Sequence, residues 1–447
     1  MARLFGTDGV RGLANVDLTA PLALELGEAA ARLTIQGRPA SGHKPKAIIG
    51  RDTRISGEFL DHALAAGLAS AGMDVVRVGV VTTPTVAHLT ASSSVDLGVM
   101  ISASHNPMPD NGIKFFAHGG YKLPDQVEDQ IQELLNTSWD RPTGAAVGEV
   151  EYDDDWAEKS YIEHLMASLG TDLHGLRIAV DCANGGASFL APEAFRQAGA
   201  DAVVINAAPD GRNINDKAGS THPEQLQALT VASEADFGVA YDGDADRCLA
   251  VDRDGNIVDG DKIMGALAVH MRDEGQLAKD TLVVTVMSNL GLILAMQEAG
   301  IKTVQTGVGD RYVLEAMLEG GYSLGGEQSG HIIAKKYATT GDGILSSLLL
   351  ARMVKESGRD LADLTSFIKR LPQTLINVGG VDRSRASTDP AVQEAVAAAE
   401  AVLGNTGRVL LRPSGTEPLV RVMVEAATQS QADGVASRLA DVVKENL

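Results

Sequence analysis

The sequence is poor in cysteine and in basic residues, and each shortage excludes a class of protein. Two cysteines, Cys182 and Cys248, are too few to stabilise a chain of 447 residues by disulfide cross-links, so we expect a reducing compartment and no structural disulfide. Lys and Arg number 38 against 59 Asp and Glu, a formal net charge of -21 at pH 7. Duplex-binding proteins show the opposite balance or a dense basic stripe, so we expect no nucleic-acid partner.

Long apolar segments are also missing. No uninterrupted apolar run approaches the roughly 18 residues that a membrane-spanning helix needs. The first residues, MARLFGTDG, lack the apolar stretch of about 7 to 15 residues found in a signal peptide. We therefore expect a cytoplasmic protein that does not contact a membrane.

The composition that remains is that of a folded protein. Hydrophobic residues make up 44% and charged residues 22% of the chain, which is typical of globular domains. At roughly 150 residues per domain, the length predicts about three domains, or four small ones. Because the chain is acidic, binding an anionic ligand would require it to concentrate its few cations locally or to recruit a metal ion.

The order of apolar and polar segments predicts an α/β fold. Short β-branched runs alternate with Ala/Leu-rich stretches of helical period, the pattern of β-α-β units. An Ala-Gly pair followed by a Val-bearing strand recurs at 71–72, 198–199 and 299–300, which indicates an internal repeat. We predict three related α/β domains with mixed, mostly parallel sheets and a smaller C-terminal α+β domain, with these bounds: 1–155, 156–255, 256–370 and 371–447.

The repeat places three polar loops at equivalent positions. Aligning Asp96 with Asp236 superimposes Ser104 on Asp244, and the third copy supplies Glu327. Each loop follows a predicted strand. In open α/β sheets, ligands bind beyond the carboxyl ends of the strands, so the alignment predicts one site built from three domains.

The segment 101–114, ISASHNPMPDNGIK, carries the first of these loops. Small residues, proline and Asn-Gly allow the backbone to approach a ligand, while Ser104, His105 and Lys114 offer a hydroxyl and cations. A plain surface turn is the alternative. Serine-hydrolase chemistry is disfavoured because adjacent Ser and His side chains on an extended chain point to opposite faces, and no G-x-S-x-G elbow occurs.

The second loop, YDGDADR, places carboxylates at alternate positions, on Asp242, Asp244 and Asp246. Carboxylate oxygens are hard ligands, so the pattern predicts a divalent cation site, with a solvated acidic turn as the alternative. An EF-hand is excluded, since Arg247 and Arg253 stand where its loop requires Gly and Glu.

Four weaker loops complete the set. GGEQSGH offers groups suited to sugar hydroxyls or an amine, and RPSGTEP with Arg421 just beyond it offers a phosphate nest. GTDGVRG can hold Arg11 toward an anion. TGVGDR is a strand-to-helix junction without nucleotide-binding spacing, because Tyr312 stands where the third glycine would be.

Taken together, these motifs resemble the α-D-phosphohexomutase superfamily. GTDGVRG, ISASHNPMPDNGIKFF, DGDADR, GGEQSGH and RPSGTEP occur in the order of that family, over essentially the whole chain. The resemblance implies four domains around a central cleft. Gln328 matches the branch that acts on glucosamine phosphates, where relatives acting on glucose or mannose phosphates commonly read GEMSGH. The resemblance therefore implies interconversion of glucosamine 6-phosphate and glucosamine 1-phosphate, a reaction that would feed UDP-N-acetylglucosamine and cell-wall precursor synthesis.

The resemblance also assigns roles and cofactors. It implies a phosphoserine at Ser104, Mg²⁺, and glucosamine 1,6-bisphosphate as intermediate and activator, with a hexosamine phosphate as the small-molecule partner. The metal ligands would be Ser104, Asp242, Asp244 and Asp246, and the transfer site would be lined by Arg11, His105, Lys114, Arg247 and His331. Substrate would be bound by Thr306, Gly307, Glu327, Ser329, Arg412, Ser414, Gly415, Thr416 and Arg421.

Several alternatives stay open at the level of sequence. A phosphomannomutase or phosphoglucomutase of the same superfamily is one, and a non-catalytic sugar-phosphate-binding protein is another. The general base is open between Lys114 and His331, because geometry must decide it. The oligomeric state, including a homodimer, is open as well.

Overall fold

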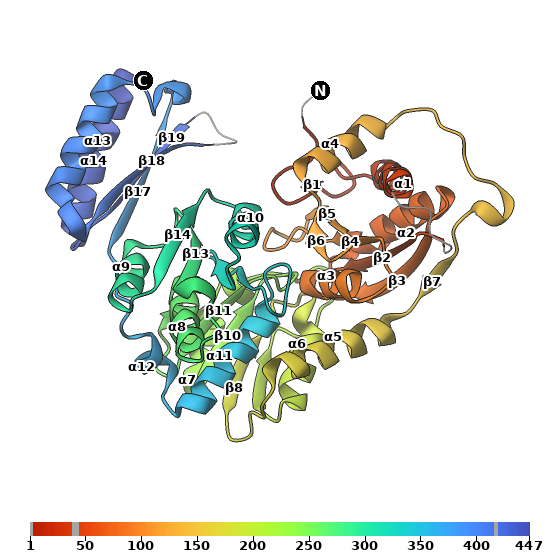
Figure 1. Ribbon diagram of the computed structural model, residues 1–447, viewed down its shortest axis with the longest axis horizontal. Helices are drawn as coiled ribbons and strands as arrows, with labels where there is room; N and C mark the ends of the chain where they lie inside the picture. The colour runs from red at the N-terminus through yellow and green to blue at the C-terminus, as the bar shows by residue number, and fades with distance from the viewer. Residues whose placement is uncertain (1–2, 38–43, 415–418) are drawn as a thin grey trace. The chain divides into compact units, whose positions relative to one another are not determined.

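The computed structural model describes residues 3–37, 44–414 and 419–447 (Figure 1). Its strands form sheets of seven, five, four and three strands in the described part of the chain. The chain divides into two compact units, one of Met1–Met287 with Ile301–Ser366 and one of Ser288–Gly300 with Phe367–Leu447. The first three sheets and the predicted strand-end loops therefore belong to one unit.

The first sheet has a parallel centre and an antiparallel edge. Its order is β1-β5-β4-β2-β3-β7, with β6 paired to β5. Strand β2 pairs in parallel with β3 and β4, whereas β5 runs antiparallel to β4 and β1. The strands are β1 (Val10–Leu13), β2 (Lys46–Arg51), β3 (Asp74–Val80), β4 (Leu97–Ile101), β5 (Asp110–Ala117), β6 (Tyr121–Lys122) and β7 (Val150–Tyr152).

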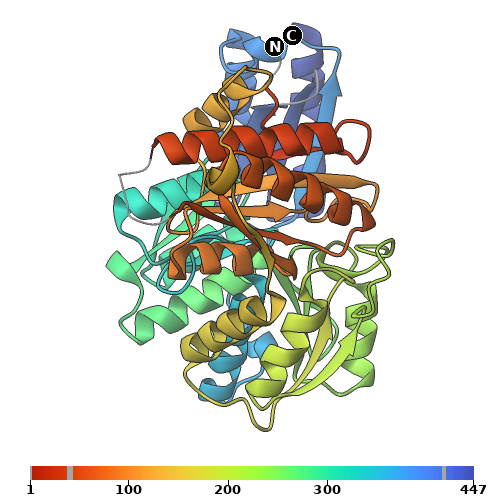
Figure 2. The same ribbon diagram turned by 90° about the vertical axis from the view of Figure 1, so that its right-hand side faces the viewer.

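Helices cover this sheet and close its core. Figure 2 shows α1 and α2 side by side over one face of the sheet. Leu26, Leu60 and Leu64 from these helices pack with Ile49 and Val99 of the strands, and all five are buried. The helices are α1 (Ala20–Gln36), α2 (Ile55–Ser70), α3 (Thr83–Ser92) and α4 (Asp125–Leu134). Thr19 caps α1 by accepting a bond from the Leu22 N–H, ahead of a proline in the first turn.

The second and third sheets repeat this plan. Their orders are β12-β11-β10-β8-β9 and β14-β13-β15-β16. In each sheet the central pairs are parallel, while β10–β11 and β15–β16 are antiparallel. The strands are β8 (Arg177–Asp181), β9 (Asp201–Ile205), β10 (Phe237–Tyr241), β11 (Cys248–Asp252), β12 (Ile257–Val258), β13 (Thr281–Thr285), β14 (Lys302–Thr306), β15 (Leu324–Gly326) and β16 (Ile332–Ala334).

The helices of these two sheets begin with side-chain caps where the sequence offers them. Asp259 caps α8 through the Lys262 N–H, and Asp342 caps α11 through the Leu345 N–H. The helices are α5 (Asp154–Leu169), α6 (Ala187–Gln197), α7 (Glu224–Ala232), α8 (Gly260–Asp273), α10 (Asp310–Gly320), α11 (Gly343–Ser357) and α12 (Leu361–Thr365). Helix α9 (Leu290–Glu298) follows β13 in the chain and belongs to the second unit. Short 3₁₀ turns lie at Gly144–Ala146, Gly219–Thr221, Ala278–Asp280, Arg383–Arg385 and Gly404–Thr406.

The second unit is a small α+β fold. Its antiparallel sheet has the order β17-β19-β18, with α13 and α14 packed on it. Glu425 accepts hydrogen bonds from Asn289 Nδ2 and the Leu290 N–H, which joins the start of α9 to this unit. The elements are β17 (Gln373–Gly379), α13 (Pro390–Leu403), β18 (Arg408–Pro413), β19 (Leu419–Glu425) and α14 (Gln429–Asn446).

The predicted α/β class is confirmed, and the internal repeat is visible in individual contacts. Asp96 accepts a bond from the Lys46 N–H, as Asp236 does from the Arg177 N–H, both at 2.9 Å. Each aspartate precedes the third strand of its copy. The same hydrogen bond therefore stands before β4 and before β10, in agreement with the alignment of Asp96 with Asp236.

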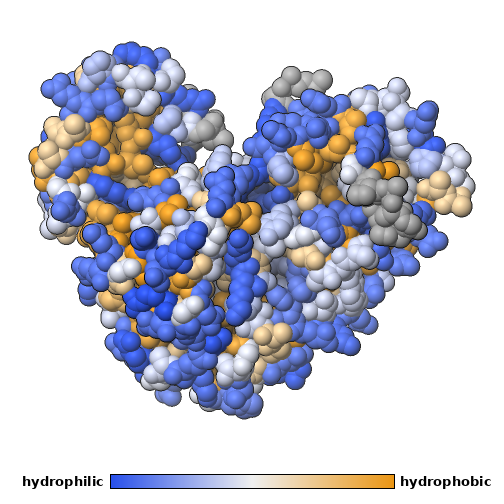
Figure 3. Space-filling model, viewed as in Figure 1, coloured by the Kyte–Doolittle hydropathy of each residue, from blue (hydrophilic) through white to orange (hydrophobic). Residues whose placement is uncertain are grey.

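Hydrophilic residues predominate on the face drawn in Figure 3, and hydrophobic residues gather in several patches between them. Within the described residues, no helix combines the length and apolar character needed to cross a membrane.

Candidate active site

Three polar loops of the first unit lie at the carboxyl ends of equivalent strands. The serine loop follows β4, the aspartate loop follows β10, and the GEQSGH loop follows β15. The loops also contact one another: Ser104 Oγ donates to Asp242 Oδ2 at 2.5 Å, and the N–H of Cys248, which directly follows the aspartate loop, donates to the Gly330 carbonyl at 3.0 Å. The structure thus brings together the loops that the sequence repeat placed at one site.

Ser104 faces the aspartate loop. Its backbone is left-handed, with φ of 53°, and its side chain is buried. Oγ donates a hydrogen bond to Asp242 Oδ2 at 2.5 Å and lies 3.3 Å from His105 Nδ1. The close approach requires glycine at 243, where a Cβ would lie 2.6 Å from the Ser104 carbonyl oxygen. The hydroxyl of Ser104 and the carboxylates are therefore held in direct contact.

The three aspartates form a buried carboxylate cluster. Asp242, Asp244 and Asp246 each offer an oxygen, and these oxygens lie within 4.8 Å of one another. Burial and the repulsion of Asp246 and Asp244 raise the pKa of Asp242 to about 8. Burial acts in the same direction on Asp246, but His331 and Lys114 together bring its pKa well below the usual range.

This donor set fits a magnesium ion. One oxygen each of Asp244 and Asp246, Oδ1, is buried and has no hydrogen-bond partner among the described residues. A buried carboxylate oxygen without a partner is costly, and a hard divalent cation would satisfy both oxygens while relieving the mutual repulsion. Asp242, Asp244 and Asp246, joined by the oxygen of Ser104, are thus able to hold the ion.

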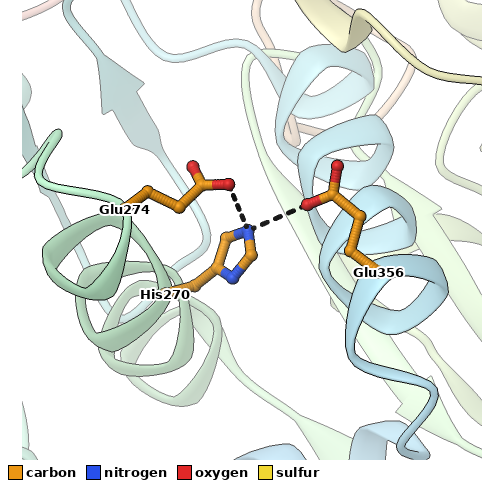
Figure 4. Close-up of side chains that lie close together, drawn as sticks. All are labelled: His270, Glu274 and Glu356. Atoms are coloured by element: carbon orange, nitrogen blue, oxygen red, sulfur yellow. Dashed lines mark ion pairs between the residues drawn. The ribbon is translucent and has the colours of Figure 1, made fainter.

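A second group of metal-type side chains fits an ion less well. His270 Nε2 lies 3.6 Å from Glu274 and 3.5 Å from Glu356, between α8 and α11 (Figure 4). Arg352 already pairs with both carboxylates, at 2.9 and 2.8 Å. Because the guanidinium supplies the positive charge that a metal ion would bring, the aspartate cluster fits a metal ion better than this group does.

Cations line the serine and aspartate loops. Lys114, buried on β5, lies 2.7 Å from Asp244 Oδ2 and 2.9 Å from Asp8 Oδ2. Burial opposes its charge, yet Asp244 and Asp8 raise its pKa above the usual value. Arg11 on β1 forms an ion pair with Asp8. The predicted residues Arg11 and Lys114 thus lie together and are linked through Asp8.

Arg247 and His105 meet beside Ser104. Arg247 Nη1 lies 3.0 Å from His105 Nδ1, and its Nε lies 3.8 Å from Asp246 Oδ1. Burial and the positive charge of Arg247 lower the pKa of His105 to about 4. His105 is therefore neutral near pH 7 and accepts a hydrogen bond at Nδ1.

A buried chain of alternating charges continues from this site to α10. Lys122 Nζ bridges Asp8 Oδ1 at 2.5 Å and Asp310 Oδ2 at 2.6 Å. His331 lies between Asp310 and Asp246, with Nε2 and Nδ1 each 3.6 Å from a carboxylate oxygen. The sequence analysis did not assign Asp8, Lys122 or Asp310. Asp8 and Asp310 stand inside two of its motifs, whereas Lys122 follows the Gly119-Gly120 turn without any local signal.

The predicted sugar-binding residues line the neighbouring loops of the third sheet. Glu327 Oε1 accepts a bond from the Gly309 N–H at 3.2 Å, and Ser329 is exposed. Thr306 ends β14 and donates to the Gly307 carbonyl at 2.9 Å. Gln328 Nε2 donates to Asp261 at 3.1 Å and lies 3.5 Å from Asp259, at the start of α8, so its amide nitrogen is already engaged.

The predicted phosphate residues lie in the second unit. Arg412 on β18 stands directly opposite Arg421 on β19. Burial and the charge of Arg421 lower the pKa of Arg412. Ser414 is buried, and its N–H donates to the Leu419 carbonyl at 2.9 Å. Gly415 and Thr416 lie outside the described residues. Two facing guanidiniums repel each other, and a bound anion would relieve that repulsion.

Comparisons with known families cover nearly the whole chain. Residues 2–141, 159–255 and 259–371 match the phosphoglucomutase/phosphomannomutase alpha/beta/alpha domains I, II and III, respectively. Residues 375–442 match the phosphoglucomutase/phosphomannomutase C-terminal domain. The four matched segments therefore follow the domain order of that family.

Curated relatives match from end to end. The chain is 60% identical over 452 residues to the phosphoglucosamine mutase of Bifidobacterium animalis subsp. lactis, and 59% identical over 452 residues to that of Streptomyces coelicolor. Each alignment covers 100% of both chains.

Solved structures share the architecture. A phosphoglucomutase/phosphomannomutase family protein from Burkholderia thailandensis superimposes with a TM-score of 0.81 at 26% identity, covering 99% of this chain and 97% of that one. The N-acetylphosphoglucosamine mutase of Aspergillus fumigatus, solved with GlcNAc-6P and magnesium, superimposes with a TM-score of 0.70, covering 99% and 96%. Its 20% identity supports the fold alone.

Proposed function

Because the chain belongs to the phosphoglucosamine mutase family of the phosphohexomutases, we propose that it interconverts glucosamine 6-phosphate and glucosamine 1-phosphate through a phosphorylated Ser104. The observation that carries the mechanism is the buried hydroxyl of Ser104, which is hydrogen-bonded to Asp242 and lies beside His105. Lys114 and Arg247 pair with Asp244 and His105 in the same cluster. Phosphoryl transfer requires a fixed oxygen and positive charge around the phosphoryl group, with little covalent work from the protein.

The proposed cycle moves one phosphoryl group in each half. The bond from phosphorus to Ser104 Oγ breaks as a bond to O1 of glucosamine 6-phosphate forms, and the O1 proton passes to Oγ. The product is glucosamine 1,6-bisphosphate. After the bisphosphate turns around, Oγ takes the 6-phosphoryl group, the proton passes to O6, and glucosamine 1-phosphate leaves.

The residues of the site divide this work. Lys114 is held as an ammonium by Asp244 and Asp8, so we assign it charge stabilisation in preference to proton removal. Arg247 and Arg11 add positive charge, and neutral His105 accepts from Arg247. Mg²⁺, when bound by Asp242, Asp244 and Asp246, supplies positive charge to the phosphoryl oxygens. His331 Nε2 accepts a bond from the Gly341 N–H at 3.0 Å, which leaves Nδ1 to face Asp246.

The remaining residues complete the proposal. The sugar would be bound by Glu327, Ser329, Thr306 and Gly307. The phosphate that is not reacting would be bound by Arg412, Ser414, Gly415, Thr416 and Arg421. The domain bounds 1–155, 156–255, 256–370 and 371–447 belong to the same proposal, as do the central cleft, the cytoplasmic location and a homodimer.

Comparison of substrates tests this function. Turnover should be measured with glucosamine 6-phosphate, glucose 6-phosphate and mannose 6-phosphate, each with Mg²⁺ and the matching 1,6-bisphosphate. We expect the highest kcat/KM on the amino sugar, and an intact-mass increase of one phosphoryl group after incubation with the bisphosphate. A higher kcat/KM on either hydroxyl sugar would favour a phosphomannomutase or phosphoglucomutase, and binding without any turnover would favour a sugar-phosphate-binding protein.

A further inference from the structure

The serine loop is fixed by two side chains that come from different sheets. Arg54, the residue before α2, is fully buried, and Asn215, in the loop after β9, is 9% exposed. Arg54 Nη2 donates to the carbonyl oxygens of Ser104 at 3.0 Å and Asn106 at 2.8 Å. Asn215 Nδ2 donates to the same two oxygens, at 2.9 and 3.2 Å. Each carbonyl therefore receives two donors, one from each sheet.

The other donors of Arg54 are also occupied. Nη1 donates to the Pro107 carbonyl at 2.6 Å, and Nε donates to Asp52 Oδ2 at 2.9 Å. The same Asp52 oxygen accepts from Ser102 Oγ at 2.6 Å, and Ser102 Oγ accepts from the Ser104 N–H at 2.9 Å. The N–H and the carbonyl of Ser104 are thus both tied to the Asp52–Arg54 pair.

These contacts hold Ser104 in an unfavourable backbone conformation. With φ of 53°, Ser104 lies in the left-handed region that non-glycine residues rarely adopt, so surrounding contacts must maintain it. That conformation directs Oγ toward Asp242. A phosphoryl group can be transferred only when the donor and acceptor oxygens stand in line, and a displacement of about 1 Å costs roughly a hundredfold in rate.

From this arrangement we infer that Arg54 and Asn215 are positioning residues, which clamp the serine loop so that Oγ occupies one place in both halves of the cycle. The inference rests on the proposed function, because it concerns the same serine. Both side chains bond to backbone carbonyl oxygens of the serine loop, so both act through the backbone of that loop. Removing one should lower turnover without changing which sugar phosphate binds.

Asn215 offers the cleaner variant because its backbone is also left-handed, with φ of 57°, and glycine adopts that conformation without strain. Asn215→Gly removes the shared donor and leaves Arg54 in place. Asn206 provides a matched control: its φ is 50°, and its Nδ2 donates to Asp181 at 3.1 Å, away from the serine loop. Both variants lose one amide donor from a left-handed position.

We expect Asn215→Gly to lower kcat about ten- to a hundredfold relative to Asn206→Gly, with KM for glucosamine 6-phosphate changed less than about threefold. The rate at which glucosamine 1,6-bisphosphate phosphorylates Ser104, followed by intact mass, should fall by the same factor. Arg54→Lys should reduce kcat as well, since lysine cannot reproduce the guanidinium fork. Equal kcat in Asn215→Gly and Asn206→Gly, or a change confined to KM, would overturn the clamp.

A structural measurement separates this inference from the proposed function. In a crystal structure of Asn215→Gly, we expect Ser104 to leave the left-handed region or to lose its hydrogen bond to Asp242. An unchanged Ser104 would overturn the clamp even if the parent chain proved to be a mutase. Conversely, a displaced Ser104 would support the clamp even if the parent chain showed no turnover, in which case only the proposed function would fail.

Discussion

Ser104 Oγ donates a 2.5 Å hydrogen bond to Asp242 Oδ2, and this contact joins the loop after β4 to the loop after β10. The two strands belong to different sheets and are the third strands of two copies of one repeat. The proposed nucleophile and the carboxylates thus come from equivalent positions of related domains.

Ser104→Ala should abolish mutase turnover, because it removes the oxygen that accepts the phosphoryl group. The substitution removes the hydrogen bonds of Ser104 Oγ but creates little empty volume, so the unfolding midpoint should change little. Ser93→Ala provides the control, since the hydroxyl of Ser93, just past the end of α3, donates to the Leu89 carbonyl of that helix and should be dispensable. Steady-state kinetics and intact mass measure both variants. Near-parental activity in Ser104→Ala would contradict the phosphoserine mechanism.

Asp244→Asn should weaken the apparent affinity for Mg²⁺ by about tenfold or more, because one carboxylate charge is lost from a hard-ion site. Measuring the rate against Mg²⁺ concentration gives the apparent affinity. Glu356→Gln, in the cluster beside Arg352, should leave that dependence unchanged. If Glu356→Gln shifted the dependence and Asp244→Asn did not, the metal site would have to be reassigned to the cluster in Figure 4.

Arg412→Ala should lower kcat/KM by roughly 10- to 150-fold, about 1.5 to 3 kcal/mol, through the loss of a charge-assisted phosphate contact. Arg412→Lys should also weaken binding, since only a planar guanidinium can take two phosphate oxygens at once. Glucosamine 1,6-bisphosphate should escape more often, raising the amount of added bisphosphate that the reaction requires. Exposed Arg438 in the same domain supplies matched Ala and Lys controls. An unaltered KM with no bisphosphate leakage would refute the phosphate-binding assignment.

We expect His88 to make the fold sensitive to acid. Its ring stacks on His164 with centroids 4.2 Å apart, and burial followed by the charge of His164 lowers its pKa to about 4. The unfolded chain takes up a proton below about pH 6.5, whereas native His88 does not, so acid favours unfolding. Stability should therefore fall by about 2 to 3 kcal/mol as the pH drops from 6.5 toward 4.

The variant His88→Phe keeps a planar ring against His164 but cannot take up a proton. Its urea unfolding midpoint should fall less than that of the parent chain between pH 7 and pH 5. The comparison uses the change with pH within each protein, so any loss of packing that is the same at both pH values cancels. Equal shifts in the two proteins would show that His88 does not cause the acid sensitivity.

Much of the fold could be predicted from the sequence because short segments specify each element of the repeat. Gly119-Gly120 and Asp254-Gly255 are dipeptides typical of hairpin turns, and the structure pairs Ala117 with Tyr121 and Val251 with Ile257. Such turns depend on residues that accept positive φ, a property of the sequence over a few positions. The serine and aspartate loops were likewise recognisable, since their residue types and spacing are local.

The buried charges around the site could not be read in this way. Lys122 lies 188 residues from Asp310 along the chain, and Asn215 lies 111 residues from Ser104, yet each pair is in hydrogen-bond contact. Neither Lys122 nor Asn215 stands in a motif that reveals its partner. A buried polar group is costly without a hydrogen-bond partner, and the folded chain supplies that partner from a residue far away in the sequence.

The sequence by itself determined how the strands and helices alternate and that three copies of one repeat precede a smaller domain, and it predicted the serine and aspartate loops as the centre of the chemistry. Tertiary structure decided which copies meet, and with them the buried contacts that hold Ser104 in a left-handed conformation against Asp242. The physical reason is range: turn, cap and periodicity signals act over a few residues, whereas packing joins atoms that the chain keeps far apart.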